Sequence, residues 1–485
     1  MAATSEQGRA GKPARLTPVL RDTTSLAASR LAVAALGWAG TLILIRVLTR
    51  TGFGQYSLVF GVLGMLEIVT QSLAPRVALR GLTDSDDPEV FFGGYVLLRS
   101  ALGVLAYGVA MGFVVVAGYP PVVVRTTAVA GLVLVNVISD SYWLVLTVRQ
   151  ELYRLAIAQL LGQLVQLALT VGLALAGASV TVFTLPVVAG QVVVLAYVLR
   201  CGRAMIRPRY RFQPRSWKPL LLASVPVAVG EGLVILYQNV DSVLLSKLQG
   251  FQAVAIYNVG SKFSILAEVF PMAISFATAG VLAKAWPERP DAFYGTVRNM
   301  FLALTMAAGL VLVEFSVFAP QAIALLYGHR YAMAADAARL VVAGACVAFL
   351  SIVATAALAA QGRNSSYVIA GGAGLLLNVG LNLVLIPALS YTGAGIVTLV
   401  SEAAVAACQA GVLLARAHHP VMPWRPLGRC VAAGGVAAAV AVGTARLLPW
   451  PAAAALAGAV YLGGLHALRV NGRRGLRSFA LDVTA

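Results

Sequence analysis

The chain has 485 residues, of which 60% are hydrophobic and only 11% are charged. Soluble globular domains hold roughly a quarter of charged residues, so this composition excludes an ordinary soluble enzyme or binding domain. The net charge of +18 comes from basic residues in short segments between apolar runs, which is typical of membrane topology and does not indicate a nucleic-acid partner.

Apolar runs that can cross ~30 Å of hydrocarbon as helices recur from Thr24 almost to the C-terminus. The runs leave no room between them for a soluble domain. The expected fold class is therefore an all-α polytopic membrane protein with about fourteen transmembrane helices. In chain order the predicted spans are 24–48, 54–78, 91–117, 123–147, 153–176, 180–200, 219–245, 253–283, 293–319, 337–360, 365–387, 393–415, 429–447 and 451–468.

A basic segment at 201–218 divides the first twelve spans into two sets of six. We expect an N-terminal six-helix bundle at 24–200 and a C-terminal six-helix bundle at 219–415. Two further helices are expected within 416–468. The polar segments 1–23 and 469–485 are predicted to be cytoplasmic tails.

The distribution of Lys and Arg predicts the orientation of these spans. If the N-terminus is cytoplasmic, 25 of the 36 basic residues lie on the cytoplasmic side and seven on the outer side. This bias favours cytoplasmic N- and C-termini. The outer loops are brief, and the longest of them, 321–336, has room for only a short surface helix.

The two sets of six spans share a weak sequence repeat. The segment RVLTRTGFGQYSLVFGVLGMLE at 46–67 aligns without gaps with KLQGFQAVAIYNVGSKFSILAE at 247–268. Transporters are often built from two such halves with the substrate path between them. The matching pairs are Arg46 with Lys247, Tyr56 with Tyr257, and Glu67 with Glu268.

Four basic residues fall within predicted spans, where a charge at the bilayer centre costs about 2.5–3.5 kcal/mol. Lining a wet cavity, such groups would attract a diphosphate, and arginine would offer it paired hydrogen bonds. The alternative is that the arginines reach the cytoplasmic membrane surface with their long side chains. The candidate substrate-binding residues are Arg30, Arg76, Arg99 and Lys262.

Polar side chains recur on single faces of several spans, which predicts a hydrated lumen. Hydrogen bonds between helices are the alternative explanation for some of them. The acidic residues among them could relay protons, coordinate Na⁺ or neutralise the intramembrane bases. The candidate lumen residues are Asp140, Gln163, Glu231, Gln238 and Glu268.

A third candidate set could hold a hard cation. Asn378 and Asn382 lie one helical turn apart, and Thr398 lies in the next span, so all three offer oxygen ligands. The four cysteines form no CxxC pair, and neither a zinc site nor a disulfide framework is indicated. We expect no cofactor other than Na⁺ or H⁺ as a coupling ion.

Three segments carry a family resemblance: GFGQYSLVFGVLGMLEIV from Gly52, NVDSVLLSKLQGFQAVAIYNVGSKFSIL from Asn239, and LLLNVGLNLVLIPALSYTGAGIVTLVSE from Leu375. They resemble the polysaccharide transport (oligosaccharide flippase) family. This family belongs to the multidrug/oligosaccharidyl-lipid/polysaccharide exporter superfamily, with MATE exporters and the lipid II flippase. The resemblance implies two six-helix bundles in a V around a central lumen, working by alternating access.

The resemblance also implies a substrate and site residues. Family members typically move undecaprenyl-diphosphate-linked oligosaccharides from the cytoplasmic to the outer leaflet, and Arg30 and Lys262 match basic positions of helices 1 and 8. The lipid II flippase has a Na⁺ site that Asp241, Asn378, Asn382 and Thr398 resemble. Asn382 stands where that flippase has an acid, so a Na⁺ site here would bind its ion more weakly.

The expected partners are a lipid-linked glycan, the bilayer of a bacterial cytoplasmic membrane and polysaccharide assembly proteins, with the chain itself a monomer. One alternative is a MATE-like multidrug exporter, which would favour an acidic lumen without four intramembrane bases. The alternative from another class is a membrane-embedded polysaccharide polymerase or ligase. Such enzymes generally need a sizeable outer loop or soluble domain, so we do not expect an enzyme.

Overall fold

The computed structural model describes residues 16–71, 75–149, 151–211, 214–415, 417 and 419–470. Every regular element in these ranges is helical. Ten helices there are long and apolar enough to cross a membrane. The predicted multi-pass, all-α class is confirmed, and the two predicted tails lie largely outside the described ranges.

The first six predicted spans correspond to helices α1 to α9. Most are single helices, but the fourth is broken into α5, α6 and α7. The breaks fall at Gly131 and Asn136, where α4 approaches so closely that a Cβ on Gly103 would lie 2.4 Å from the carbonyl oxygen of Leu134. The bounds are α1 Leu16–Val47, α2 Arg50–Gln71, α3 Pro75–Thr83, α4 Pro88–Val116, α5 Pro121–Ala130, α6 Leu132–Val135, α7 Val137–Val148, α8 Leu152–Leu175, η1 Val182–Thr184 and α9 Leu185–Gly202.

The remaining spans correspond to helices α10 to α17. The eighth predicted span is broken at Glu268, just before Pro271, whose ring nitrogen has no proton to donate to the helical ladder. The bounds are α10 Pro214–Leu248, α11 Phe251–Ala267, α12 Val269–Ala285, α13 Pro290–Tyr327, η2 His329–Ala334, α14 Ala335–Ala360, α15 Asn364–Leu414, α16 Trp424–Thr444 and α17 Trp450–Ala467.

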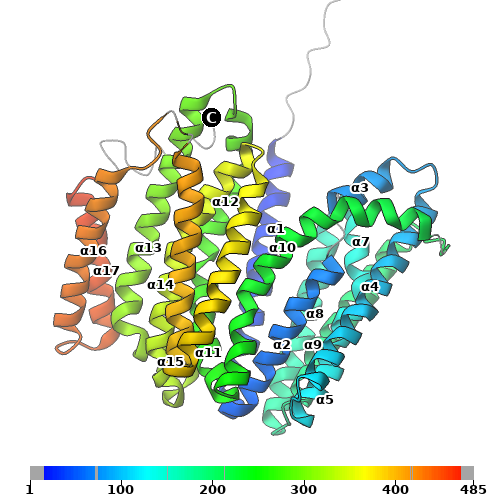
Figure 1. Cartoon of the computed structure of the whole chain (residues 1–485), viewed down its shortest axis with the longest axis horizontal. Helices are drawn as coiled ribbons and strands as arrows, with labels where there is room; N and C mark the ends of the chain where they lie inside the picture. The colour runs from blue at the N-terminus through cyan, green and yellow to red at the C-terminus, as the bar shows by residue number, and fades with distance from the viewer. Residues whose placement is uncertain are drawn as a thin grey trace, which may run out of the picture.

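Helix α15 contains two membrane spans, which are joined by a sharp reversal of the chain. As a straight helix its 51 residues would extend for about 75 Å, more than twice the hydrocarbon thickness. Ser390 has a left-handed φ of 53° and reverses the chain there. The two legs, yellow and orange in Figure 1, run side by side, as the predicted spans 365–387 and 393–415 require.

The stretch 321–336, predicted as an outer loop, is more helical than expected. Helix α13 continues past Pro320 to Tyr327, and the short 3-10 helix η2 follows it. The predicted short helix is therefore present, but the loop itself shrinks to a single turn at Gly328.

The helices form two groups that diverge toward the side where α1 begins (Figure 1). We call this the terminal side and the opposite side the far side. Helix α2 packs against both α10 and α11 and so joins the two groups. Helices α16 and α17 pack on α13 at the edge of the second group.

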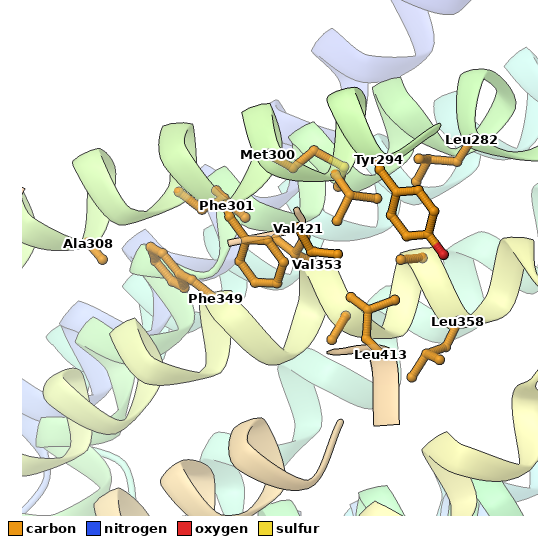
Figure 2. Packing of buried hydrophobic residues seen from close by; sticks show 14 of the residues in the cluster. Leu282, Tyr294, Met300, Phe301, Ala308, Phe349, Val353, Leu358, Leu413 and Val421 are labelled. Atoms are coloured by element: carbon orange, nitrogen blue, oxygen red, sulfur yellow. The ribbon is translucent and has the colours of Figure 1, made fainter. Parts of the chain in front are cut away.

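A large apolar core holds the second group together. Figure 2 shows Met300 and Phe301 of α13 packed against Phe349 and Val353 of α14. Leu413, at the end of α15, closes the same cluster. This interdigitation makes the second group a rigid support for the polar residues that lie between its helices.

Candidate functional site

One basic residue of the first group lies in a mostly buried position beside an exposed acid. Arg99 of α4 is 7% exposed, and its Nη2 donates to the carbonyl oxygen of Thr70 near the end of α2 at 3.1 Å. The same nitrogen lies 3.9 Å from Oδ2 of Asp140 on α7. The Asp140 side chain is 65% exposed, so the pair is open on one side.

Of the other three predicted basic residues, only Lys262 has a described side chain, and it lies apart from Arg99. Lys262 is a partly exposed residue of α11, in the second group of helices, and makes no ion pair with any described residue. Arg30 and Arg76 belong to α1 and α3, and their side chains lie outside the described part of the structure.

The predicted lumen residues separate into exposed and packed ones. Asp140, Glu231 and Gln238 are exposed although they lie within spans, whereas Gln163 and Glu268 are only partly exposed. The Nε2 atom of Gln163 lies against Gly37 of α1, 3.4 Å from where a Cβ would stand. Gln163 therefore contacts a neighbouring helix, in line with the interhelical alternative for some of these residues.

The four residues predicted for a cation site lie together inside the second group. Asp241 of α10 is 4% exposed, and its Oδ1 accepts from Nδ2 of Asn382 at 2.7 Å. That nitrogen also donates to Oδ1 of Asn378 at 2.9 Å. Oδ2 of Asp241 is 3.4 Å from Oγ1 of Thr398, on the second leg of α15.

Tyr257 of α11 completes this cluster; the sequence marked it through the repeat and as one of the polar residues on one face of its span, but did not assign it to the cation site. Its hydroxyl donates to Oδ2 of Asp241 and lies 2.9 Å from Oγ1 of Thr398. The buried carboxylate thus has donors from α11 and from both legs of α15, which offsets its loss of water.

The chemistry of the donor set fits a hard monovalent cation better than a transition metal. No group of three or more His, Cys, Asp or Glu side chains in the described ranges could hold a metal ion. Around Asp241 the available ligands are oxygens of one carboxylate, two amides and two hydroxyls. Oδ1 of Asn382 is buried without a hydrogen-bond partner among the described residues, and turning this amide over would direct it at Asp241.

Four basic residues that sequence reasoning did not assign to a site lie together on the far side. Arg46, Arg50, Lys247 and Arg330 all donate to backbone carbonyl oxygens of distant segments. In the sequence analysis these residues were among the seven basic residues assigned to the outer side. The match of Arg46 with Lys247 in the repeat was the one feature of the sequence that pointed to a shared role.

Comparison with solved structures places the fold. A structure described as "Lipid II flippase MurJ, inward closed conformation" matches 91% of this chain and 98% of its own, with 9% identity and a TM-score of 0.77. An inward-facing multidrug resistance MATE family transporter matches 79% of this chain and 93% of its own, with 16% identity and a TM-score of 0.64. An outward-facing MATE family transporter matches 80% of this chain and 92% of its own, with 16% identity and a TM-score of 0.55.

Comparison of the sequence with family models agrees with these structural matches. A search of curated protein sequences finds no match. The MatE family model matches residues 226–384. The family model described as "Polysaccharide biosynthesis protein" matches residues 19–286, more than half of the chain. The predicted family and superfamily are therefore confirmed, and the chain belongs to the polysaccharide biosynthesis protein family.

Proposed function

We propose that this protein is a flippase that moves a polyprenyl-diphosphate-linked oligosaccharide across the bacterial cytoplasmic membrane by alternating access. The family match, and the likeness in fold to a flippase and to transporters, support a transporter rather than an enzyme. One observation carries the assignment of the cargo: Arg99 is held within the membrane-spanning region and reaches an exposed face beside Asp140.

The charge at this position favours an anionic headgroup. Nη2 of Arg99 is held by Thr70, which fixes the direction of the guanidinium, while the exposed Asp140 leaves one side open. A diphosphate approaching from that side would find a preorganised donor and would compete with Asp140 for it. We assign Arg30, Arg76 and Lys262 to the same electrostatic path.

The exposed polar residues within the spans suit the sugar part of the substrate. Glu231 and Gln238 are exposed on α10, and Asp140 is exposed on α7. Sugar hydroxyl groups bind such carboxylates and amides through hydrogen bonds, directly or through water. The polyprenyl chain would remain in the bilayer between the two helix groups, because its transfer to water is unfavourable.

We further propose that the Asp241 cluster couples transport to a monovalent cation. Asp241, Asn378, Asn382 and Thr398 would hold Na⁺, with Asp241 as the only carboxylate to balance its charge. Oδ1 of Asn382 supports this assignment, since it is a buried oxygen that accepts no hydrogen bond from any described residue and could bind a cation instead. The terminal side would be cytoplasmic, because basic residues are concentrated there.

The test of the flippase proposal is export of the host's surface glycan. The double variant Arg30→Ala with Lys262→Ala should reduce export while the protein remains in the membrane, and Arg99→Ala should reduce it further. A matched control is Arg125→Ala, because Arg125 is exposed on the far side and bonds only the carbonyl of Pro121 in its own helix. Unchanged surface glycan in all variants would exclude this diphosphate path.

A further inference from the structure

On the far side, a basic residue of the first helix group binds the end of a helix in the second group. Arg46 lies in the last turn of α1, and its Nε donates to the carbonyl oxygen of Leu326 at 2.8 Å. Its Nη2 donates to the carbonyl oxygen of Leu325 at 2.6 Å. Both acceptors belong to the last turn of α13, whose carbonyls have no partner further along the helix.

The contact is reciprocal. Arg330 of η2, which follows α13, donates to the carbonyl oxygens of Ile45 and Leu48, the latter at 2.9 Å. These carbonyls lie at the end of α1. Arg50 adds a third link, because its Nη2 donates to the carbonyl oxygen of Arg330 at 2.6 Å. Arg46 thus caps the end of α13, and Arg330, which follows α13 in η2, caps the end of α1.

The sequence repeat places a second contact of the same kind. Lys247, which aligns with Arg46, lies in the last turn of α10 and donates to the carbonyl oxygen of Ala117 at the end of α4. The lysine also lies over the ring of Tyr119, 3.7 Å from its centre. The Tyr119 hydroxyl in turn lies 2.7 Å from Oγ of Ser246.

The two contacts are equivalent positions of the two halves. Helices α1 and α10 are the first spans of their halves, and α13 and α4 are the third spans of the opposite halves. In each case a cation at the end of a first span caps the end of a third span across the molecule. The two capping contacts are therefore related to each other by the same repeat that relates the two halves of the sequence.

The physical chemistry of these contacts makes them reversible. A cation at a helix C-terminus is stabilised by the helix dipole and by the unpaired carbonyls. The acceptors are uncharged, and no described carboxylate pairs with Arg46, Lys247 or Arg330. Arg46 and Lys247 are exposed, so they remain hydrated and the contacts can break without stranding a buried charge.

The far side is closed at the same level. Helix α2 meets the first residue of α11 so tightly that a Cβ on Gly54 would lie 1.8 Å from the carbonyl oxygen of Phe251. This close approach shuts the far side between α2 and α11.

From these contacts we infer that Arg46 and Lys247 form a two-fold latch, which holds the far side closed by capping the ends of α13 and α4. The latch rests on the proposed alternating-access function, for which it supplies the outer closure. Opening of the far side breaks both caps, and water replaces the cations at the carbonyl groups.

The experiment measures accessibility rather than transport. In a protein whose four cysteines are replaced, Gln238→Cys places one thiol on an exposed position within α10. A membrane-impermeant maleimide is applied to intact cells and, separately, to inside-out vesicles. Arg46→Ala with Lys247→Ala should raise labelling from outside about three- to tenfold and lower labelling from inside, since each cap contributes only modestly to closure.

Matched variants define the outcome. Arg46→Lys with Lys247→Arg should label like the unmodified latch, because both retain a cation, and Arg125→Ala should do the same because it contacts only its own helix. Equal labelling of the latch-free and intact proteins from both sides would overturn the latch. The labelling could change as expected in a protein whose removal does not affect export of the surface glycan. That result would support the latch and contradict the proposed substrate.

Discussion

Asn382 donates its amide nitrogen to Oδ1 of Asp241 at 2.7 Å, and so occupies the place beside the carboxylate that an ion would take. The same nitrogen is 2.9 Å from Oδ1 of Asn378, which makes it a neutral link between two oxygens. A buried carboxylate needs such donors, because isolation in a low-dielectric interior destabilises its charge. The residue at position 382 therefore determines how strongly the site binds a cation.

The first prediction concerns the substitution Asn382→Asp. Two neighbouring carboxylates repel each other, so the variant should melt at a lower temperature than the parent in potassium or choline salts at pH 8. Sodium should restore much of this loss, because ligand binding stabilises the folded state by ~2.7 kcal/mol at a hundredfold excess over Kd. Thermal unfolding of the purified protein in each salt measures the effect.

Two comparisons make this result decisive. The parent protein should show a smaller difference between sodium and potassium, since it offers one carboxylate fewer. Asp241→Asn should show none. If Asn382→Asp melts at the same temperature in every salt, the proposed cation ligands are wrongly assigned.

The second prediction concerns the hydroxyl group of Tyr257. Tyr257→Phe removes a donor to the buried carboxylate of Asp241, which should destabilise the protein by about 1–3 kcal/mol. Tyr56→Phe is the matched control, because Tyr56 is the repeat partner of Tyr257 on α2 and its ring lies against that of Phe60 at a centroid distance of 4.5 Å. A fall in unfolding temperature confined to the Tyr257 variant is expected, whereas equal effects in both would contradict the role of this bond.

The sequence predicted the spans well because their signal is physical and strong. The segment 91–117 is the helix Pro88–Val116, and 451–468 is the helix Trp450–Ala467. A run of apolar residues long enough for the bilayer leaves the backbone few alternatives to a helix. The breaks at Gly131 and Glu268 were missed. The first depends on the close approach of α4, and the second lies just before Pro271, within a run whose length and apolar character predicted one unbroken span.

The site was predicted unevenly for the same reason. Asp241, Asn382 and Thr398 come together because the two legs of α15 fold back beside α10. The spacing of the oxygens suggested the residues of α15, whereas only the family resemblance added Asp241. Lys262 and Arg99, in contrast, lie in different helix groups. Sequence alone places a charge in a span, but the distance across the molecule is set by how the two halves pack.

The third prediction separates the charge of Arg99 from its geometry. Arg99→Gln should abolish most export of the glycan, because it removes the cation and leaves the carbonyl of Thr70 with a weaker donor. Arg99→Lys should keep a measurable part, since an ammonium still attracts a diphosphate but cannot bind it through two parallel hydrogen bonds. Export is measured as surface glycan per copy of protein in the membrane. Equal export by the two variants would show that the charge of Arg99 does not act on the substrate.

The last prediction concerns the close approach of α2 and α11. Gly54→Ala puts a methyl group where the carbonyl oxygen of Phe251 lies, so the two helices must separate. Overpacking of this kind typically costs about 1–3 kcal/mol, and here it acts on the closed far side. The variant should therefore label more readily from outside at Gln238→Cys than the parent does. Gly112→Ala is the matched control, because no atom outside its own helix lies within 4 Å of the added methyl group. A Gly54→Ala protein that folds, melts and labels like the Gly112→Ala protein would mean that α2 and α11 do not form the closure.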